Sequence, residues 1–354
     1  MAFLSKFFGG ASTVGVDIGT TTIKIVELAK RGDKPELLNY GSLEGYGYLD
    51  RVNNAIQTSS LKLVESETQE LLRVLLKQVK IKGKNVVASL PPFSAFSTLI
   101  EIPQMSDQET SKVVYYQAKA AVPMPIADAT IDWTRIEEFE DERGIKKQRI
   151  FLIAVVNENI QRYKKIFSGV GLNLQVLELE GVSLARALTT GDQKLSIIAD
   201  IGGRSTTITV AGGGLVRYNT QIDFAGSSLT QAVATGLNIN MKRAEELKKQ
   251  RGLIGTGGEY ELSTLMSPFL DVILSEVKRV KYFYEKNYKT NIERIILSGG
   301  GANLKGIQKY VEREFQLPAE IADPFGRVRY SPSIAPAIAE IGPGFSVAMG
   351  LALK

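Results

Sequence analysis

The chain has 354 residues, 44% of them hydrophobic, which exceeds what one core usually organises, so we expect two or more domains. Its 43 basic and 38 acidic residues leave a net charge of only +5 with no dense basic run, which argues against a nucleic-acid partner. Cysteine and histidine are both absent, which excludes Ser-His-Asp and Cys-His catalysis, disulfides and the usual zinc sites, and leaves the carboxylates, hydroxyls and lysines that suit phosphoryl transfer.

The first motif is an apolar strand that ends at Asp17 and turns back through Gly19, Thr20 and Thr21 into a strand carrying Lys24. Glycine permits a positive φ in such a tight turn, and the hydroxyl residues begin the return strand. Backbone N–H groups of the turn would form an anion-binding concavity, while Asp17 is placed to hold a metal-bound water. The pattern predicts a phosphate-binding hairpin.

Further strands and a helix follow this hairpin. Residues 25–28 and 35–40 are expected to continue it as a meander of strands. The apolar spacing over 65–78 predicts a helix with one buried face. A buried strand is then predicted over 85–90, ending at two prolines.

An inserted subdomain is predicted over 92–172, where the strands become shorter and paired prolines appear. Its helices are expected over 111–121 and 160–169. Between them, residues 131–139 and 148–155 are expected to pair as a long hairpin across a polar tip.

A second hairpin nearly repeats the first. An apolar strand ends at Asp200, the turn contains Gly202 and Gly203, and Ser205 and Thr206 begin the return strand. The same chemistry applies, so Asp200 is a second candidate for a metal-bound water. Two such hairpins that face each other could clamp the phosphates of a nucleotide.

A glycine-rich turn is the third motif. An apolar run opens into Gly299, Gly300 and Gly301, followed by Asn303. Glycines at such a turn admit a flat ligand against bare backbone. Taken singly, each of the three motifs is more often an ordinary turn, and it is their combination that indicates a site.

The order and spacing of these motifs resemble the actin, heat-shock-70 and sugar-kinase superfamily, in which duplicated lobes close on ATP. The resemblance implies ATP and Mg²⁺ as cofactors, held by the hairpins and the glycine-rich turn, with Asp17 and Asp200 at the metal. Relatives carry an Ala-Glu-x-x-Lys helix whose acid and base reach the nucleoside. Within the charged helix predicted over 241–249, Glu245 and Lys248 are therefore the candidates for ribose and adenine contacts.

A narrower resemblance covers nearly the whole chain. The segments 122–125, 131–133, 151–156, 169–172 and 177–180 are similar to the PilM family of type IV pilus assembly proteins, which is itself similar to the division protein FtsA. In FtsA the usual 1B subdomain of actin is replaced by a differently placed 1C subdomain.

The resemblance implies an α/β, actin-like (ribonuclease H-like), two-lobed ATPase fold with an inserted subdomain of the FtsA 1C type. The first lobe (1A) would comprise residues 1–91, 173–195 and 343–354. The 1C-like insertion would span 92–172, and the second lobe (2A/2B) 196–342.

The function implied by the family is a cytoplasmic ATP-binding adaptor that binds the N-terminal cytoplasmic peptide of the inner-membrane protein PilN, within the inner-membrane pilus assembly complex. In that family the extended peptide lies between subdomains 1A and 1C. The apolar residues Phe93, Phe96 and Leu99 are the expected walls of this groove.

Recruitment to the inner face of the inner membrane is expected to depend on this protein contact. No stretch reaches the roughly 18 continuous apolar residues of a membrane span, and the N-terminus is too polar for a secretory signal. A short N-terminal helix is marginal in water and buries little, so its apolar residues are expected to pack on the first lobe rather than anchor in lipid: Phe3, Leu4, Phe7 and Phe8.

Two other functions remain open. An FtsA-like filament protein, which would self-associate, is the first alternative, and a metabolite kinase is the second. Hydrolysis of ATP also remains open, because it needs a polar group that orients a water molecule. Gln175, Glu178 and Glu180 are the candidates, although residues at the crossing between lobes more often serve to link them.

Overall fold

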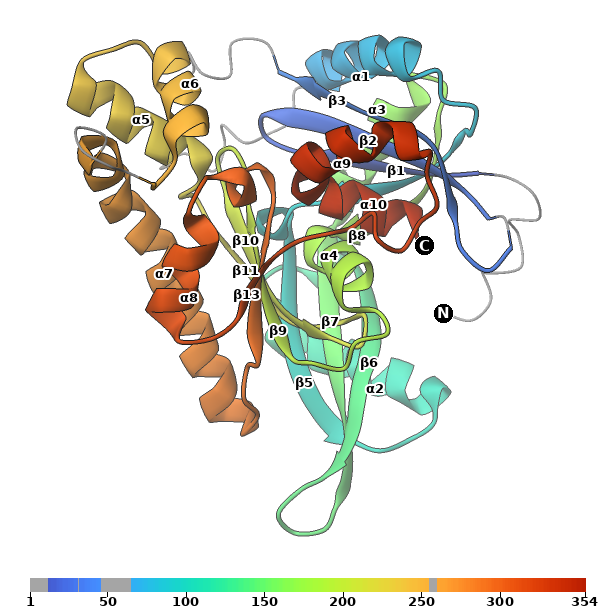
Figure 1. Cartoon of the computed structure of the whole chain (residues 1–354). Helices are drawn as coiled ribbons and strands as arrows, with labels where there is room; N and C mark the ends of the chain where they lie inside the picture. The colour runs from blue at the N-terminus through green and yellow to red at the C-terminus, as the bar shows by residue number, and fades with distance from the viewer. Residues whose placement is uncertain (1–11, 31, 46–64, 255–259) are drawn as a thin grey trace.

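The computed structural model describes residues 12–30, 32–45, 65–254 and 260–354. It contains two lobes, each built on a five-stranded sheet, and a third unit built on a three-stranded sheet (Figure 1). The N-terminal apolar residues discussed above lie outside the described part of the chain.

The first lobe contains a sheet in the order β3-β2-β1-β4-β8. The predicted hairpin forms β1 and β2, which pair antiparallel, and β4 and β8 continue the sheet in parallel. The expected meander, helix and buried strand are confirmed. The elements are β1 Thr13–Ile18, β2 Thr22–Ala29, β3 Glu36–Glu44, α1 Glu65–Val79, β4 Asn85–Leu90 and β8 Asn173–Leu179.

Helices cover both faces of this sheet. On one face, α1 and α3 (Asn157–Ser168) pack over β1, with Leu72 and Phe167 fully buried. On the other face, α9 (Ala335–Ile341) and α10 (Ser346–Ala352) pack over β2. Because α3 belongs to the core of the first lobe, the insertion ends at about residue 156 rather than 172.

The insertion has a small core of its own. Its sheet has the order β5-β7-β6, and the predicted long hairpin between β6 and β7 is confirmed. Helix α2 covers the sheet and starts four residues before the predicted helix, because Ser106 and Glu109 form a capping box. The elements are η2 Pro92–Ser94, β5 Ala95–Pro103, α2 Asp107–Ala121, η3 Ile126–Asp128, β6 Ala129–Glu140 and β7 Lys146–Val156.

The second lobe repeats the topology of the first. Its sheet has the order β11-β10-β9-β12-β13, again an antiparallel hairpin followed by two parallel strands. Its strands are β9 Ser196–Ile201, β10 Thr206–Gly212, β11 Leu215–Ile222, β12 Arg294–Ser298 and β13 Ala319–Ile321. Its helices are α5 Gly226–Leu237, α6 Met241–Arg251, α7 Tyr260–Tyr288, η5 Gly300–Asn303 and α8 Ile307–Phe315.

The chain returns to the first lobe earlier than position 343. Phe325 and Val328 pack in the same cluster as Val26 of β2. The Arg329 backbone also extends the first sheet beside β3, where Leu37 N donates to Arg329 O at 2.8 Å. These contacts place residues 325–345 with the first lobe.

Small residues allow the segments between the lobes to cross closely. Helix α4 (Glu180–Thr189) packs against both α10 and β10. A Cβ atom added at Gly350 of α10 would lie 2.0 Å from the Ser183 carbonyl oxygen, and one at Gly15 of β1 would lie 2.2 Å from the Ala348 carbonyl oxygen. The crossing therefore requires glycine at both positions.

One helical stretch among the described residues, Pro332–Ala352, is by length and composition apolar enough to cross a membrane, with a mean hydropathy of 1.4. In the structure 56% of its most apolar window is buried, and every residue of α10 is buried. The stretch is divided among two short 3₁₀ turns and two helices. It serves here as part of the core.

Gly350→Ala tests the helix crossing. The added methyl group would overlap a backbone carbonyl that cannot rotate away, so we expect a loss of about 1–3 kcal/mol in the free energy of unfolding. Urea denaturation measures it. Gly300→Ala is the control, because a Cβ atom there meets nothing within 4 Å. Equal stability of the two variants would contradict the close packing of α10 on α4.

Candidate functional site

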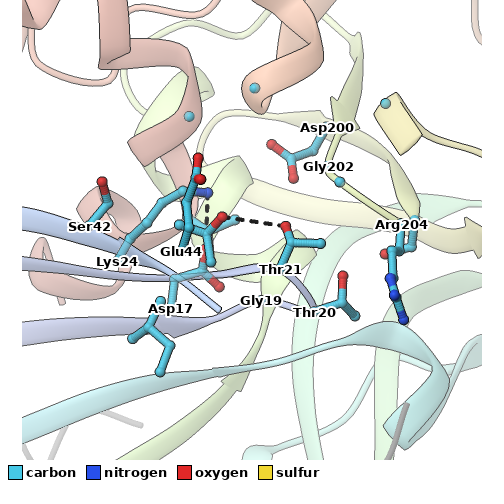
Figure 2. A pocket seen from close by; sticks show the side chains of 18 of the residues that line it. Asp17, Gly19, Thr20, Thr21, Lys24, Ser42, Glu44, Asp200, Gly202 and Arg204 are labelled. Atoms are coloured by element: carbon cyan, nitrogen blue, oxygen red, sulfur yellow. Dashed lines mark hydrogen bonds and ion pairs between the residues drawn. The ribbon is translucent and has the colours of Figure 1, made fainter. Parts of the chain in front are cut away.

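A cavity of about 890 Å³ lies where the two lobes face each other. Both hairpins, η5 and α6 contribute to its wall, as does the first turn of α4. Figure 2 shows Asp17, Thr20, Thr21 and Lys24 of the first hairpin opposite Asp200, Gly202 and Arg204 of the second. The structure therefore brings together the motifs that the sequence predicts to act jointly.

The two hairpin turns have the same local geometry. Gly19 N donates to Thr22 O at 3.0 Å, and Gly202 N donates to Ser205 O at 3.0 Å. The expectation of positive φ at Gly19, Gly202 and Gly203 is wrong, because none of the three adopts it. Instead, glycine is required by crowding.

A Cβ atom would lie 3.0 Å from Thr22 O at Gly19 and 2.8 Å from Ser205 O at Gly202. At Gly203 a Cβ atom would lie 2.4 Å from Thr21 Oγ1. This last contact joins the two hairpins directly, so a side chain at Gly203 would force the lobes apart.

Each hairpin aspartate is held by a serine from the neighbouring parallel strand. Ser89 Oγ donates to Asp17 Oδ1 at 2.8 Å, and Ser298 Oγ donates to Asp200 Oδ1 at 2.6 Å. Lys24 Nζ lies 3.8 Å from Asp17 Oδ2. Sequence reasoning missed both serines. The available signal was that each stands at the end of an apolar strand that precedes a proline or glycine break.

Glu180, at the first position of α4, is a further carboxylate in the lining of the cavity. Thr207 Oγ1 donates to Glu180 Oε2 at 2.9 Å. Burial, and then the charges of Asp17 and Asp200, raise the pKa of Glu180 to about 8. Burial likewise raises the pKa of Asp200 to about 6, although the hydrogen bond from Ser298 and the charge of Lys24 oppose the shift.

The donor set suits a hydrated hard cation. Carboxylate oxygens are the ligands that Mg²⁺ prefers, and Mg²⁺ usually keeps several of its waters. Within the described residues no cluster of three or more acidic, histidine or cysteine side chains is close enough to bind a metal directly. Asp17 and Asp200 are therefore better suited to contact a metal ion through its bound waters than to coordinate it directly.

Glu178 and Gln175, the other two candidates for orienting a water molecule, do not line the cavity. Glu178 forms ion pairs with Arg186 Nη2 at 2.6 Å and Lys354 Nζ at 2.7 Å, which links β8 to α4 and to the end of α10. Gln175 is exposed. Among the three, Glu180 alone lines the cavity.

The glycine-rich turn divides into structural and cavity-facing residues. Gly299 has φ of +77°, and a Cβ atom there would lie 2.4 Å from Ile201 O, so this glycine serves the fold. Gly300, Gly301 and Asn303 line the cavity. Asn303 Nδ2 donates to Glu340 O at 2.9 Å, which joins η5 to α9.

Glu245 and Lys248 of α6 line the cavity and bind each other. Lys248 Nζ lies 2.6 Å from Glu245 Oε2 and donates to Gly226 O at 2.9 Å and Thr230 Oγ1 at 2.8 Å. Burial lowers the pKa of Lys248, although the ion pair with Glu245 opposes this. The pair braces α6 against α5, and its contact with a nucleoside remains a prediction.

Thr206 points away from the cavity, since its Oγ1 donates to Phe224 O at 2.6 Å. The next residue, Thr207, faces the cavity instead, while Ser205 lines it as expected. Sequence reasoning also missed further lining residues, whose polar types alone carry no signal: Ser42, Glu44, Arg204 and Ser227.

The same cavity continues as a second arm, between the first lobe and the start of the insertion. Thr68 and Leu71 of α1 line this arm on one side, and Asn159 and Arg162 of α3 line it on another. Phe93 of η2 also lines this arm and is 41% exposed.

The three residues predicted to wall a peptide groove do not share a surface. Phe96 packs in the insertion core against α2, and Leu99 packs against the cores of the two lobes. Their positions differ by an odd number, so they lie on opposite faces of β5. Of the three, Phe93 alone lines the cavity.

Two lobes of the same topology, with paired aspartate-bearing hairpins facing a common cavity, define an actin-like fold. The family described as Type IV pilus assembly protein PilM matches residues 15–354, and the chain belongs to this family. Its fold class and its resemblance to PilM are thereby confirmed.

Other comparisons agree with the fold. The chain is 22% identical over 352 residues to cell division protein FtsA of Buchnera aphidicola, covering 88% of this chain and 83% of FtsA. The solved "PilM-PilN type IV pilus biogenesis complex" matches with a TM-score of 0.80 at 22% identity, over 98% of both chains. MreB 5 of Spiroplasma citri bound to AMPPNP matches with a TM-score of 0.53 at 15% identity, over 97% and 95% of the two chains.

Glu180→Gln is expected to change how stability depends on pH in the ligand-free protein. The unfolded side chain ionises near 4.5 but the folded one only near 8, so wild-type stability from this group falls as the pH rises between these values. Glutamine keeps the contact with Thr207 and cannot ionise. Relative to wild type, the free energy of unfolding of the variant should rise by on the order of a few kcal/mol between pH 5 and pH 8.

Urea denaturation at several pH values measures this difference. The control is Glu70→Gln on the exposed side of α1, which should show a constant difference from wild type. A constant difference for Glu180→Gln as well would show that Glu180 is ionised in the folded protein.

Proposed function

We propose that this chain is a cytoplasmic adaptor of type IV pilus assembly, which binds ATP and Mg²⁺ between its lobes and holds the N-terminal cytoplasmic peptide of PilN. The proposal rests on one observation, which is that residues of both lobes and of the start of the insertion line the same cavity. One part of it is lined by two phosphate-type hairpins, and its second arm opens between the first lobe and the insertion.

ATP binding is supported by the hairpins and by the AMPPNP bound to MreB 5, which shares the fold. The turn N–H groups would bind phosphate oxygens, and Asp17 and Asp200 would hold waters of Mg²⁺. Bound Mg²⁺ supplies the positive charge that neutralises phosphate oxygens and the nearby carboxylates. Glu180, once ionised, can accept a hydrogen bond from a water beside the terminal phosphate, which is the position that hydrolysis requires.

Peptide binding is supported by membership of the PilM family and by the PilM–PilN complex among the similar structures. The second arm of the cavity offers exposed apolar area at Phe93, and Asn159 and Arg162 add polar groups to its lining. Extended peptides bind where pockets accept alternate side chains next to a strand edge. Strand β5, which follows η2, is at the edge of its sheet.

In this proposal the protein is located at the inner face of the inner membrane because it binds the PilN peptide. The one apolar stretch of sufficient length in the described chain, Pro332–Ala352, is largely buried in the protein. The membrane contact is therefore assigned to the PilN peptide and the inner-membrane assembly complex that it belongs to.

An FtsA-like filament protein is the second candidate. The similarity to FtsA extends over 88% of the chain, which favours it. The nucleotide site would be the same in both cases, and the two candidates differ in whether outer surfaces bind further copies of the chain.

Asp17→Ala tests the nucleotide site. Losing the carboxylate that orders the hydrated cation should weaken Mg-ATP binding by about 1–3 kcal/mol. In the wild type, millimolar Mg-ATP should raise the unfolding temperature, since a ligand that binds only the folded state stabilises it. We expect Asp17→Ala to reduce this rise, and Gly202→Val to abolish it because a side chain would fill the turn.

Asp132→Ala is the matched control, because Asp132 is an exposed aspartate on the insertion. Its response to Mg-ATP should equal that of the wild type. If the wild type shows no ATP-dependent rise, the chain does not bind ATP as proposed.

Phe93→Asp tests the peptide arm. A charge at this exposed apolar position should abolish binding of a synthetic PilN N-terminal peptide, while Mg-ATP binding and the unfolding temperature are retained. Phe224→Asp is the control, since Phe224 is 37% exposed and does not line the cavity. Phe96→Asp should instead unfold the insertion, because Phe96 packs in its core. Isothermal titration calorimetry measures the peptide affinity.

If Phe93→Asp binds the peptide with unchanged affinity, the peptide groove lies on another surface of the protein. If the wild type binds no peptide and the ATP-bound protein sediments as a polymer, the filament candidate replaces the adaptor.

A further inference from the structure

Tyr163 of α3 is a buried tyrosine whose hydroxyl has no hydrogen-bond partner among the described residues. Its side chain is 3% exposed and lines the cavity. No residue in the described part of the chain forms a hydrogen bond with its hydroxyl, yet the oxygen is not among the fully enclosed unpaired atoms. Buried tyrosines usually pair their hydroxyl group. The free hydroxyl therefore opens into the cavity, where a ligand can accept its hydrogen bond.

The helix that carries Tyr163 is fixed on two sides. Toward α1, Arg73 Nη2 donates to Gly169 O at 2.9 Å and Gln69 Nε2 donates to Lys165 O at 3.1 Å. Toward the insertion, Asn159 Nδ2 donates to Ser94 O at 3.2 Å. The ring of Tyr163 itself packs in the core of the first lobe. The hydroxyl is thus held in place before any ligand arrives.

The surroundings identify which part of a nucleotide the hydroxyl would meet. Besides burial, the charges of Glu180 and Asp17 raise the pKa of the Tyr163 phenol, so it stays neutral and keeps its proton. These carboxylates belong to the end of the cavity where the two hairpins meet. The nucleoside wall at Glu245 and Lys248 belongs to α6 of the second lobe. Tyr163 also packs in the same core cluster as Ile18 and Leu179, which adjoin Asp17 and Glu180 in the sequence, so it lies on the side of the cavity where these carboxylates are found. In the proposed complex this is the phosphate end.

We infer that Tyr163 is a positioning and specificity residue for the terminal phosphate of a bound nucleoside triphosphate, to which its hydroxyl donates a hydrogen bond. This inference rests on the proposed binding of ATP. A nucleoside diphosphate lacks the group that accepts this bond, so Tyr163 favours the triphosphate over the diphosphate. Because α3 also lines the second arm of the cavity through Asn159 and Arg162, the residue that contacts the phosphate shares a rigid helix with the proposed peptide groove.

Tyr163→Phe tests the inference. Phenylalanine keeps the ring in the core and removes only the unpaired hydroxyl, so the ligand-free unfolding temperature should be equal or higher. We expect the Kd of Mg-ATP to rise roughly ten-fold or more, as for loss of a hydrogen bond to a charged group, while the Kd of Mg-ADP stays unchanged. Isothermal titration calorimetry with both nucleotides measures the ratio.

The matched control is Tyr284→Phe, because Tyr284 is equally buried in the second lobe and does not line the cavity. Both of its nucleotide affinities should equal those of the wild type. An unchanged ratio in Tyr163→Phe, or an equal loss for ATP and ADP, would overturn the inference while leaving ATP binding intact. Failure of the wild type to bind Mg-ATP would instead overturn the proposed function.

Discussion

The constraint on which the site depends is the meeting of three carboxylates, those of Asp17, Glu180 and Asp200, on the wall of one cavity. Asp17 and Asp200 each accept a hydrogen bond from a serine hydroxyl, and Glu180 accepts one from a threonine hydroxyl. Lys24 Nζ lies 3.8 Å from Asp17 Oδ2. Buried carboxylates of this kind are costly unless a proton or a cation accompanies them. The raised pKa of Glu180 and of Asp200 expresses that cost, and a bound cation would remove it.

The duplicated topology explains how the carboxylates meet. In each lobe a hairpin strand delivers an aspartate to its end, and the next parallel strand supplies the serine that holds it. The lobes then approach so closely that Gly203 of one turn contacts Thr21 of the other. Relative movement of the lobes would therefore change the spacing of the two hairpin turns. A ligand that bridges both turns would fix the separation of the lobes.

The sequence predicted the hairpins, the glycine-rich turn and their meeting, because strand periodicity and turn residues are local signals. Predictions from the sequence were wrong for features that depend on packing between residues far apart in the chain. The hydrogen-bond partners of α3 in α1 lie 96 residues away in the sequence, so local patterns could not predict where the insertion ends. The sequence predicts Thr206 rather than Thr207 in the cavity, which is an error of one residue along β10. Because successive side chains of a strand point to opposite faces, such an error places every side chain on the wrong face. The same loss of phase placed Phe96 and Leu99 on one wall, although they lie on opposite faces of β5.

The close fit of α10 against β1 has a consequence for how the protein is made. These two elements lie at residues 346–352 and 13–18, and the contact needs glycine at position 15 of β1. The first sheet is thus assembled from segments separated by most of the chain, which is a topology of high contact order. During synthesis β1 must wait with one face uncovered until residue 352 has left the ribosome, whereas the insertion and the strands of the second lobe can form sooner. The first lobe is therefore the last to be completed and the one most exposed to aggregation or chaperone binding before that.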